Sequence, residues 1–557
     1  MGITDFYKAT RTSSSEKRSE NATDNISNYD ETSGDELEAG VQLDQNVKSI
    51  GVISATFLII NRCIGAGIFA TGASIYNFSG SVGASLMLWV GGTIIAFSGL
   101  LVYLEFGSIL TRNGSEVVYL QHIYKKPNFL VISAYAVYAL TMPWTAGNSI
   151  VTGEYILTAA GKEVTQWNSR GIALAVVTFA FAINAFNAKL GLWVANTLGS
   201  FKIIIILFII ITGWVGLGNG IKSSNFSPTH NFSNAFDGET PTGYGIVNAL
   251  YNVIWSYVGY SNASYALGEV KNPQKVLKVA APSAFIGIAI AYMLVNIAYY
   301  AVVPTEVIST SKRILVAEFF FHAFGTNASK AASVFVALSA WGNVMSVIFA
   351  QGRIITQLGR QSVIPFSRFF GSSKPFNTPF TGLLEHWIIG IIFICAVPPG
   401  DSYNFILNLV SYPLNVINSF LGAGLIWIYI RKRQGKIEWN PPIKASLPVA
   451  IFFFLSSLYL VVAPYIPPTA GQSVYESLPY WLHAVVAWGI FGLGGIYWAV
   501  WTQLLPRLGG YKLVEKEVLG DDGFWRNKVY KVAKDSTEDE IQEQIAAENA
   551  ADSGIKH

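Results

Sequence analysis

Long apolar runs recur along almost the whole chain, and they limit the folds that it can adopt. Only 13% of the 557 residues are charged, whereas an average soluble domain has about 25%. Twelve runs approach the roughly 20 residues that a helix needs to cross a bilayer. They lie at 51–76, 80–105, 129–159, 171–187, 190–216, 243–268, 277–303, 330–352, 380–397, 403–430, 445–465 and 480–504. The sequence therefore predicts an all-α membrane protein with twelve transmembrane helices.

The basic residues predict how these helices are oriented. With the N-terminus in the cytosol, sixteen lysines and arginines fall in inner loops and six in outer loops. Because positive charge concentrates on the cytosolic side, both termini are expected there. The chain then divides into a disordered cytosolic regulatory tail at 1–48, a twelve-helix transporter core at 49–505 and a cytosolic C-terminal tail at 506–557.

The first apolar run contains Gly65-Ala66-Gly67 at its centre. Glycine pairs weaken a helix, and backbone groups freed within a bilayer must find partners in a cavity. One interpretation is an unwound span that forms half of a binding site. The alternative is close packing of two helices through small residues.

The sixth run contains a second polar, glycine-bearing centre, from Trp255 to Ser264. Two interrupted spans five segments apart are typical of a five-plus-five inverted repeat, with helices 1 and 6 unwound at the midplane. This second interruption favours the binding-site interpretation of the first.

The two unwound spans would suit a zwitterion. N–H groups at the start of a helix near Ala66 attract a carboxylate. Carbonyls near Cys63, Trp255 and Val258 can accept an ammonium group. The candidate binding residues are therefore Cys63, Ile64, Gly65, Ala66, Gly67, Trp255, Val258 and Gly259. With no buried acid or base evident for a charged substrate side chain, the preferred amino acid is expected to be neutral.

Two further side chains are singled out near this site. Lys202 lies within an apolar run, where a charge must face protein or water. It is interpreted either as a fixed cation against helices 1 and 8 that couples transport, or as a lysine that extends to the membrane interface. Trp255 is the candidate outer gate. Arg62, beside the first interruption, has no partner that the sequence identifies.

Motifs for enzymatic chemistry are missing. The six histidines have no metal-ligand spacing, and there is no phosphate-binding loop or nucleophile elbow. An enzyme, a cofactor, a bound metal and a nucleic acid partner are therefore not expected. Residues 105–126, between the second and third runs, are expected to hold a short surface helix. In the C-terminal tail, Thr537–Ile545 is expected to be helical and solvated.

Several motifs resemble those of the L-type amino acid transporters of the amino acid–polyamine–organocation superfamily. Gly65-Ala66-Gly67-Ile68-Phe69 is similar to the family motif of helix 1, and Trp255–Tyr260 to that of helix 6, with Val258 and Tyr260 replacing a glycine and a tryptophan. Lys202 matches the lysine of sodium-independent members. Within the family, Gly435–Pro442 and Gly520–Arg526 resemble the fungal high-affinity methionine permeases.

This resemblance implies import of methionine, with cysteine as a second substrate, across the plasma membrane together with a proton. It also implies downregulation through the N-terminal tail, with a ubiquitin-ligase adaptor as partner; a plain solvated spacer is the alternative for that tail. The loop at 161–170 has no cysteine, so no disulfide-linked heavy subunit is expected. An amino acid exchanger and a non-transporting receptor remain alternatives for the function. Membrane lipid is expected to surround the apolar helices.

Overall fold

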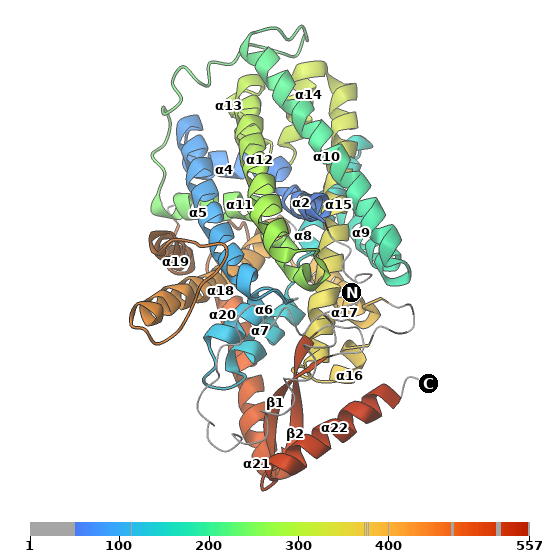
Figure 1. Ribbon diagram of the computed structural model, residues 1–557. Helices are drawn as coiled ribbons and strands as arrows, with labels where there is room; N and C mark the ends of the chain where they lie inside the picture. The colour runs from blue at the N-terminus through green and yellow to red at the C-terminus, as the bar shows by residue number, and fades with distance from the viewer. Residues whose placement is uncertain are drawn as a thin grey trace, which may run out of the picture. The chain divides into compact units, whose positions relative to one another are not determined.

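The computed structural model describes residues 51–554, except 113, 373, 375, 377, 399, 469–472 and 520–524. The predicted tail at 1–48 lies outside these residues. Figure 1 shows a bundle of helices followed by a two-stranded hairpin and a last helix. Ten helical stretches in the described part are long and apolar enough to cross a membrane, and two more apolar helices, Leu315–Phe324 and Phe380–Ala396, are shorter. The chain is therefore a multi-pass membrane protein.

The first half of the bundle holds the first interruption. Its elements are α2 (Val52–Cys63), α3 (Gly67–Ala70), α4 (Gly72–Ser79), α5 (Val82–Ile109), α6 (Glu116–Ile123), α7 (Leu130–Thr141), α8 (Ala146–Ala159), α9 (Gln166–Phe186) and α10 (Ala188–Leu217).

The second half begins at the second interruption. It contains α11 (Gly243–Tyr257), the 3₁₀ helix η1 (Asn262–Glu269), α12 (Pro273–Val302), α13 (Thr305–Thr310), α14 (Leu315–Phe324), α15 (Thr326–Arg360), α16 (Ser367–Phe370), α17 (Phe380–Ala396), α18 (Ser402–Arg433), α19 (Leu447–Val462), η2 (Ala463–Tyr465), α20 (Leu482–Ala499), the π-helical η3 (Val500–Leu504) and α21 (Leu505–Gly509).

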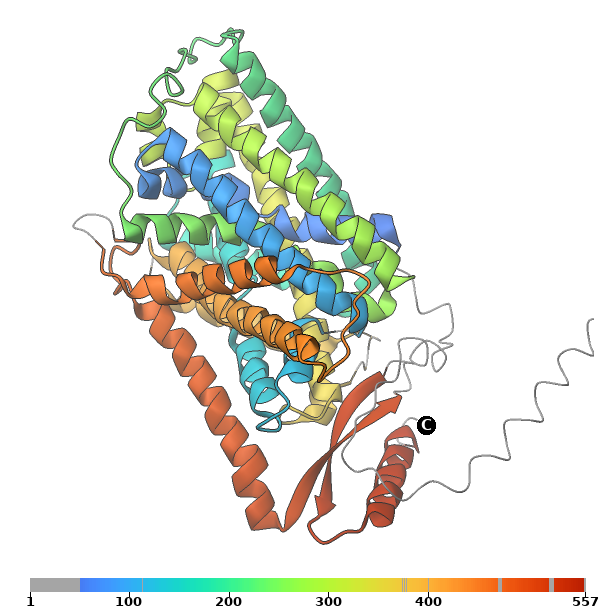
Figure 2. The ribbon, with the colours of Figure 1, turned by 60° about the vertical axis from the view of Figure 1, so that its left-hand side comes forward.

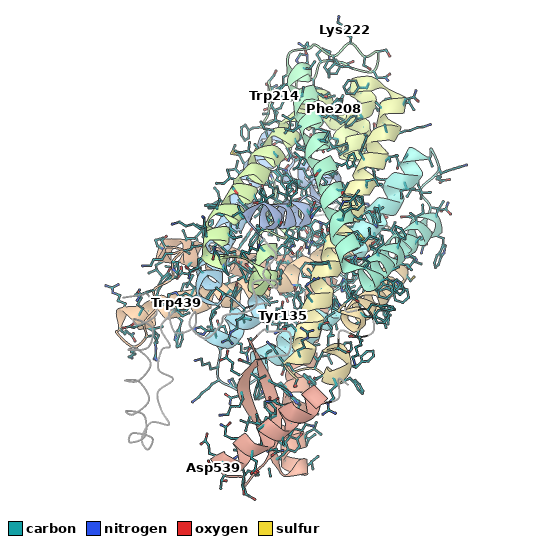
Figure 3. The ribbon with its side chains drawn as sticks, turned by 45° about the vertical axis from the view of Figure 1, so that its right-hand side comes forward. Tyr135, Phe208, Trp214, Lys222, Trp439 and Asp539 are labelled. Carbon is teal, nitrogen blue, oxygen red and sulfur yellow. The ribbon has the colours of Figure 1, made fainter. Side chains whose placement is uncertain are left out.

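The outer surface of the bundle is apolar. Along α10, Ile204, Leu207, Ile211 and Trp214 are each more than half exposed, and Figure 3 labels Trp214 and Phe208 on this helix. A soluble protein would not leave such a stripe uncovered. We therefore expect lipid to cover α10, which corresponds to the fifth apolar run of the sequence.

The sequence analysis treated the third apolar run as one helix, but the helix is broken. It is divided into α7 and α8, with Met142 to Thr145 between them. Pro143 has no N–H to donate, and the residue before a proline avoids helical geometry. Met142 is accordingly extended, with ψ of 123°. This break places the Trp144 side chain beside the site described below.

The expected helix between the second and third runs is α6, but it is not a surface helix. Glu116, Val117, Tyr119 and Leu120 are buried. The acidic carboxylate at its start is therefore inside the protein, which the polar composition of this stretch did not indicate.

The C-terminal region is folded. Strands β1 (Tyr511–Leu519) and β2 (Trp525–Ala533) form an antiparallel hairpin, with Tyr511 opposite Ala533. The helix α22 (Glu538–Gly554) follows (Figure 2). The predicted helix at 537–545 is confirmed, although Ile545 packs on the hairpin against Tyr530 and Val532. The transporter core was predicted to end at residue 505, but the last long helical stretch continues to Gly509.

The hairpin is attached to the bundle through polar contacts. Arg112 forms an ion pair with Glu517, and Gln121 of α6 donates a hydrogen bond to Glu515. The N–H of Val529 donates to the carbonyl of Gln361, after α15. The hairpin thus lies against the loops at the end of the bundle where α6 begins.

Candidate functional site

The first interruption lies at Ile64 to Ala66. Ile64 leaves helical geometry with ψ of 85°, and the N–H of Gly65 turns back to the carbonyl of Cys63 at 2.9 Å. Helix geometry resumes at Gly67. The first N–H groups of a helix have no partner within it. One of them, the N–H of Ala66, donates to Oδ1 of Asn148 on α8 at 3.0 Å.

The second interruption follows Tyr257. Val258 has ψ of 122°, and Gly259 has φ of +119°, a conformation that a side chain would strain. The chain then continues as η1, a tighter helix with i to i+3 hydrogen bonds. Both predicted glycine-bearing centres are thus places where the helix stops.

The two interruptions are in direct contact. A Cβ placed on Gly67 would lie 2.7 Å from Cα of Ser256, and one on Gly259 would overlap Cγ of Arg62. The hydroxyl of Tyr292, on α12, donates to the carbonyls of Cys63 at 2.9 Å and Ser256 at 3.0 Å. Glycine at 67 and 259 is therefore what allows the two chains to approach.

Protein donors already bind several carbonyls of the first interruption. Nζ of Lys202 donates to the carbonyls of Asn61 at 3.0 Å and Ile64 at 2.5 Å. Nδ2 of Asn343, on α15, donates to the carbonyl of Arg62 at 2.6 Å. The carbonyls that the sequence analysis reserved for a ligand near Cys63 are thus partly satisfied by side chains. Carbonyls at the end of α11 also have partners, since Ser256 accepts from Tyr292 at 3.0 Å and Trp255 accepts from the N–H of Val258 at 3.1 Å.

The position of Lys202 excludes one of its two interpretations. Its side chain is 1% exposed, and Cε lies 3.4 Å from where a Cβ on Gly342 of α15 would be. The ammonium group therefore lies between the first interruption and α15. A lysine that extends to the membrane surface would be exposed at its end, so that alternative is wrong.

Trp255 is buried near the end of α11, beside the hydroxyl of Tyr403. The guanidinium of Arg313 lies 5.5 Å from the centre of the Tyr403 ring. It also donates two hydrogen bonds to Glu154 of α8, at 2.8 and 2.5 Å. Tyr155 donates to the carbonyls of Phe69 at 3.3 Å and Arg313 at 2.7 Å. These contacts join α3, α8 and the segment around Arg313 on one side of the interruptions.

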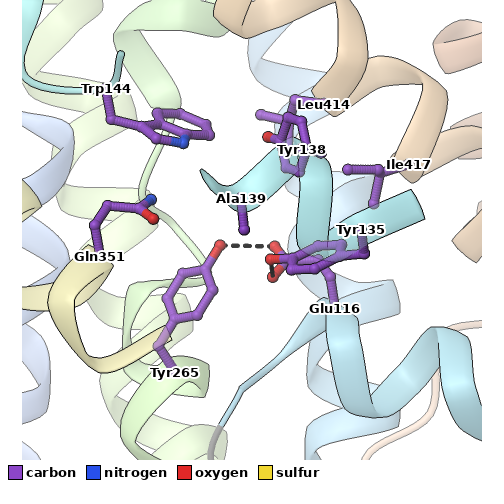
Figure 4. Close-up of a pocket in the computed structure, with 9 residues that line it drawn as sticks. All are labelled: Glu116, Tyr135, Tyr138, Ala139, Trp144, Tyr265, Gln351, Leu414 and Ile417. Atoms are coloured by element: carbon purple, nitrogen blue, oxygen red, sulfur yellow. Dashed lines mark hydrogen bonds between the residues drawn. The ribbon is translucent and has the colours of Figure 1, made fainter. Parts of the chain in front are cut away.

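A cavity opens on the other side of the interruptions, with an empty volume of about 490 Å³. We call it the Arg62–Glu116 cavity. Residues from six elements and two loops line it, including Arg62, Glu116, Trp144, Tyr265, Gln351 and Leu414. A smaller hollow of about 270 Å³ shares five of these residues and adds Tyr135 and Tyr138 (Figure 4). Val258 and Gly259, both candidate binding residues, form the wall of the cavity nearest the interruptions.

Glu116 is the buried acid that the sequence analysis did not identify. Its Oε1 accepts hydrogen bonds from Tyr103 at 3.0 Å and Tyr265 at 2.8 Å, and Oε2 accepts one from Tyr135 at 3.4 Å. Figure 4 shows the carboxylate between Tyr265 and Tyr135. Burial raises the pKa of this carboxyl group, and the tyrosine hydrogen bonds oppose the rise. The earlier premise that no acid is buried is therefore wrong.

A family model described as amino acid permease matches residues 50–491, which include both interruptions and Lys202. The chain belongs to this amino acid permease family. The permease is 58% identical to the high-affinity methionine permease of Saccharomyces cerevisiae, over 90% of this chain and 88% of that protein. It is 26% identical to the low-affinity methionine permease of the same yeast, over 86% of each chain. It is 30% identical to the b(0,+)-type amino acid transporter 1 of Mus musculus, over 83% of this chain and 90% of that protein.

The sequence analysis missed several side chains near the site. Asn148, Trp144 and Gln351 each lie next to an interruption or the cavity. Asn148 is a polar residue within an apolar run, which was a usable signal. Glu154 lies inside the third apolar run, where a charge was a usable signal as it was for Lys202, whereas Arg313 lies in a predicted loop and gave none.

The ion pair between Glu154 and Arg313 supports a prediction about the permease. The side chains of Arg313 and Glu154 are 21% and 10% exposed, so removing one partner costs less than the roughly 3–5 kcal/mol of a fully buried pair. Arg313→Gln is expected to weaken the proposed closure at this contact and to lower the maximal uptake rate by about tenfold. Lys312→Gln, at the adjacent exposed residue, is the control and should transport normally. Unchanged uptake by Arg313→Gln would show that the pair is not part of closure.

Proposed function

We propose that the permease is a secondary transporter that imports L-methionine across the plasma membrane. The observation that carries the proposal is the direct contact of two interrupted helices, in a chain 58% identical to a high-affinity methionine permease. Backbone groups at such a contact can hold both ends of an amino acid without a buried side-chain charge.

The proposed arrangement has twelve spans. The ten long helical stretches, the shorter α17, and α11 together with η1 make up this number. The interrupted spans are then the first and sixth, as in a five-plus-five inverted repeat, with their breaks at the midplane. Both termini and α6 would face the cytosol. The Arg62–Glu116 cavity would lie on the cytosolic side, and the contact between Glu154 and Arg313 on the outer side.

Each end of methionine has a proposed partner. The carboxylate would bind at the start of α3, where the N–H groups of Gly67 and Ile68 lie at the positive end of a helix. The ammonium would bind carbonyls at the end of α11, from Trp255 to Val258. Asn148 holds the N–H of Ala66 at 3.0 Å and so fixes the geometry of the turn. Trp255 would close the site from outside, and cysteine would be a second substrate.

Lys202 is the proposed coupling residue. Its ammonium group binds two carbonyls of the first interruption, so a change in its protonation would change how that turn is held. Transport would then be driven by protons and would not need sodium. A ubiquitin-ligase adaptor acting on the N-terminal tail, and function without a disulfide-linked heavy subunit, are also part of the proposal.

Uptake of labelled methionine tests this function. The permease would be expressed in a strain that lacks its own methionine permeases, and neutral amino acids would compete at two pH values. We expect saturable uptake, strongest at the more acidic external pH, with methionine as the best competitor. Binding without uptake would indicate a receptor. Uptake that requires amino acid trapped inside vesicles would indicate an exchanger.

A further inference from the structure

Arg62 is a buried cation with no carboxylate partner among the described residues. Its side chain is 8% exposed. One long hydrogen bond, of 3.5 Å, joins it to Oδ1 of Asn343, and its guanidinium lies 5.4 Å from the centre of the Trp144 ring. A guanidinium has five N–H donors, and a buried charge without partners is costly. Arg62 is thus suited to an anionic group that reaches the cavity from elsewhere.

A hydrogen-bond acceptor without a partner lines the same space. Oε1 of Gln351 is buried and forms no hydrogen bond with a described residue, and neither does Oη of Tyr138 in the adjoining smaller hollow. Glu116 lines the cavity too, and no ion pair joins it to Arg62 within the described part of the chain. The cavity is therefore lined by the cation Arg62, the acid Glu116 and the amide oxygen of Gln351, and none of these groups pairs with another among the described residues.

We propose that the Arg62–Glu116 cavity is a second amino acid site, separate from the site at the two interruptions. The guanidinium of Arg62 would bind the carboxylate of the amino acid, as arginine does in bidentate pairs. Glu116 and Oε1 of Gln351 would accept hydrogen bonds from its ammonium group. An apolar side chain would lie against Val347, Ile354 and Leu414, which line the cavity as well.

The charge of the cavity lining fits a zwitterion. One positive and one negative side chain leave the lining with no net charge, so a zwitterion adds none. The cavity begins at Val258 and Gly259 and reaches Glu116. An amino acid released from the interruptions would therefore meet this second site on its way to the α6 side.

The inference depends on the proposed function, and one experiment separates the two. Equilibrium binding of tritiated L-methionine would be measured on the purified full-length permease in detergent. We expect two molecules bound per chain in the wild type and one in Glu116→Gln. The matched control is Glu105→Gln. Glu105 is also buried, but it accepts hydrogen bonds from Tyr429 and Trp439 and lies outside the cavity lining; this variant should bind two.

A second variant fills the cavity without changing its charge. Ala350→Phe, on α15, places a ring in the space that the second molecule would occupy, and it too should bind one. If Glu116→Gln does not fold, the number of methionine molecules bound by Ala350→Phe tests the inference instead. A single site in the wild type, or two sites in either cavity variant, would overturn the inference and leave the proposed function intact. Absence of any saturable methionine binding would overturn the proposed function itself.

Discussion

Replacing Gly67 with alanine is expected to abolish methionine uptake while the protein still reaches the cell surface. The added Cβ would lie 2.7 Å from Cα of Ser256, which is backbone and cannot rotate away. Overpacking of this kind costs about 1–3 kcal/mol, which a large membrane domain can tolerate. It would, however, separate α3 from the end of α11. If these two ends hold the amino acid, uptake should fall by about a hundredfold, because a misplacement of about 1 Å can cost about 10²-fold.

The matched control for this variant is Gly91→Ala. Gly91 lies in α5, and a Cβ placed there would meet nothing within 4 Å. Uptake and surface expression would be measured side by side for both variants. Normal affinity for methionine in Gly67→Ala would remove the contact between the two interruptions from the binding site.

Replacing Lys202 with alanine is expected to have the second large effect. The variant should lose the dependence of uptake on external acidity, because the proposed coupling group, which holds the first interruption, would be gone. It should also be slow, since the carbonyls of Asn61 and Ile64 lose their donor. An unsatisfied buried polar group costs about 1–3 kcal/mol.

The pH profile distinguishes coupling from a purely structural role. Wild type, Lys202→Ala and the control Lys222→Ala would be compared between mildly acidic and neutral external pH; Lys222 is an exposed lysine of the loop after α10. A structural role alone would lower uptake equally at every pH. A wild-type profile in Lys202→Ala would assign proton coupling to another group.

Both interruptions could be predicted from the sequence because their signal is local. A glycine pair in an apolar run conflicts with an unbroken span, whatever surrounds it. Lys202 could be predicted for the same reason, since a charge inside such a run must have a protein or water partner. The division of the third run was also visible, at Pro143, but the length of the run concealed it.

Other features depend on tertiary packing and left no local signal. Glu116 occurs in a polar stretch, and its burial comes from tyrosines on α5, α7 and η1 that are distant in sequence. The C-terminal hairpin is a different case. Two runs that contain valine, tyrosine and tryptophan stand on either side of a short glycine-containing stretch, which is a known hairpin pattern. The expectation of a simple tail overlooked it.

The central claim is that two interrupted helices hold the amino acid by their backbone groups. A cryo-electron microscopy structure of the full-length permease with bound L-methionine tests it most directly. The account predicts the methionine carboxylate within hydrogen-bond distance of the N–H groups at the start of α3, and the ammonium beside carbonyls from Trp255 to Val258. Methionine held only by side chains, or bound away from both interruptions, would contradict it.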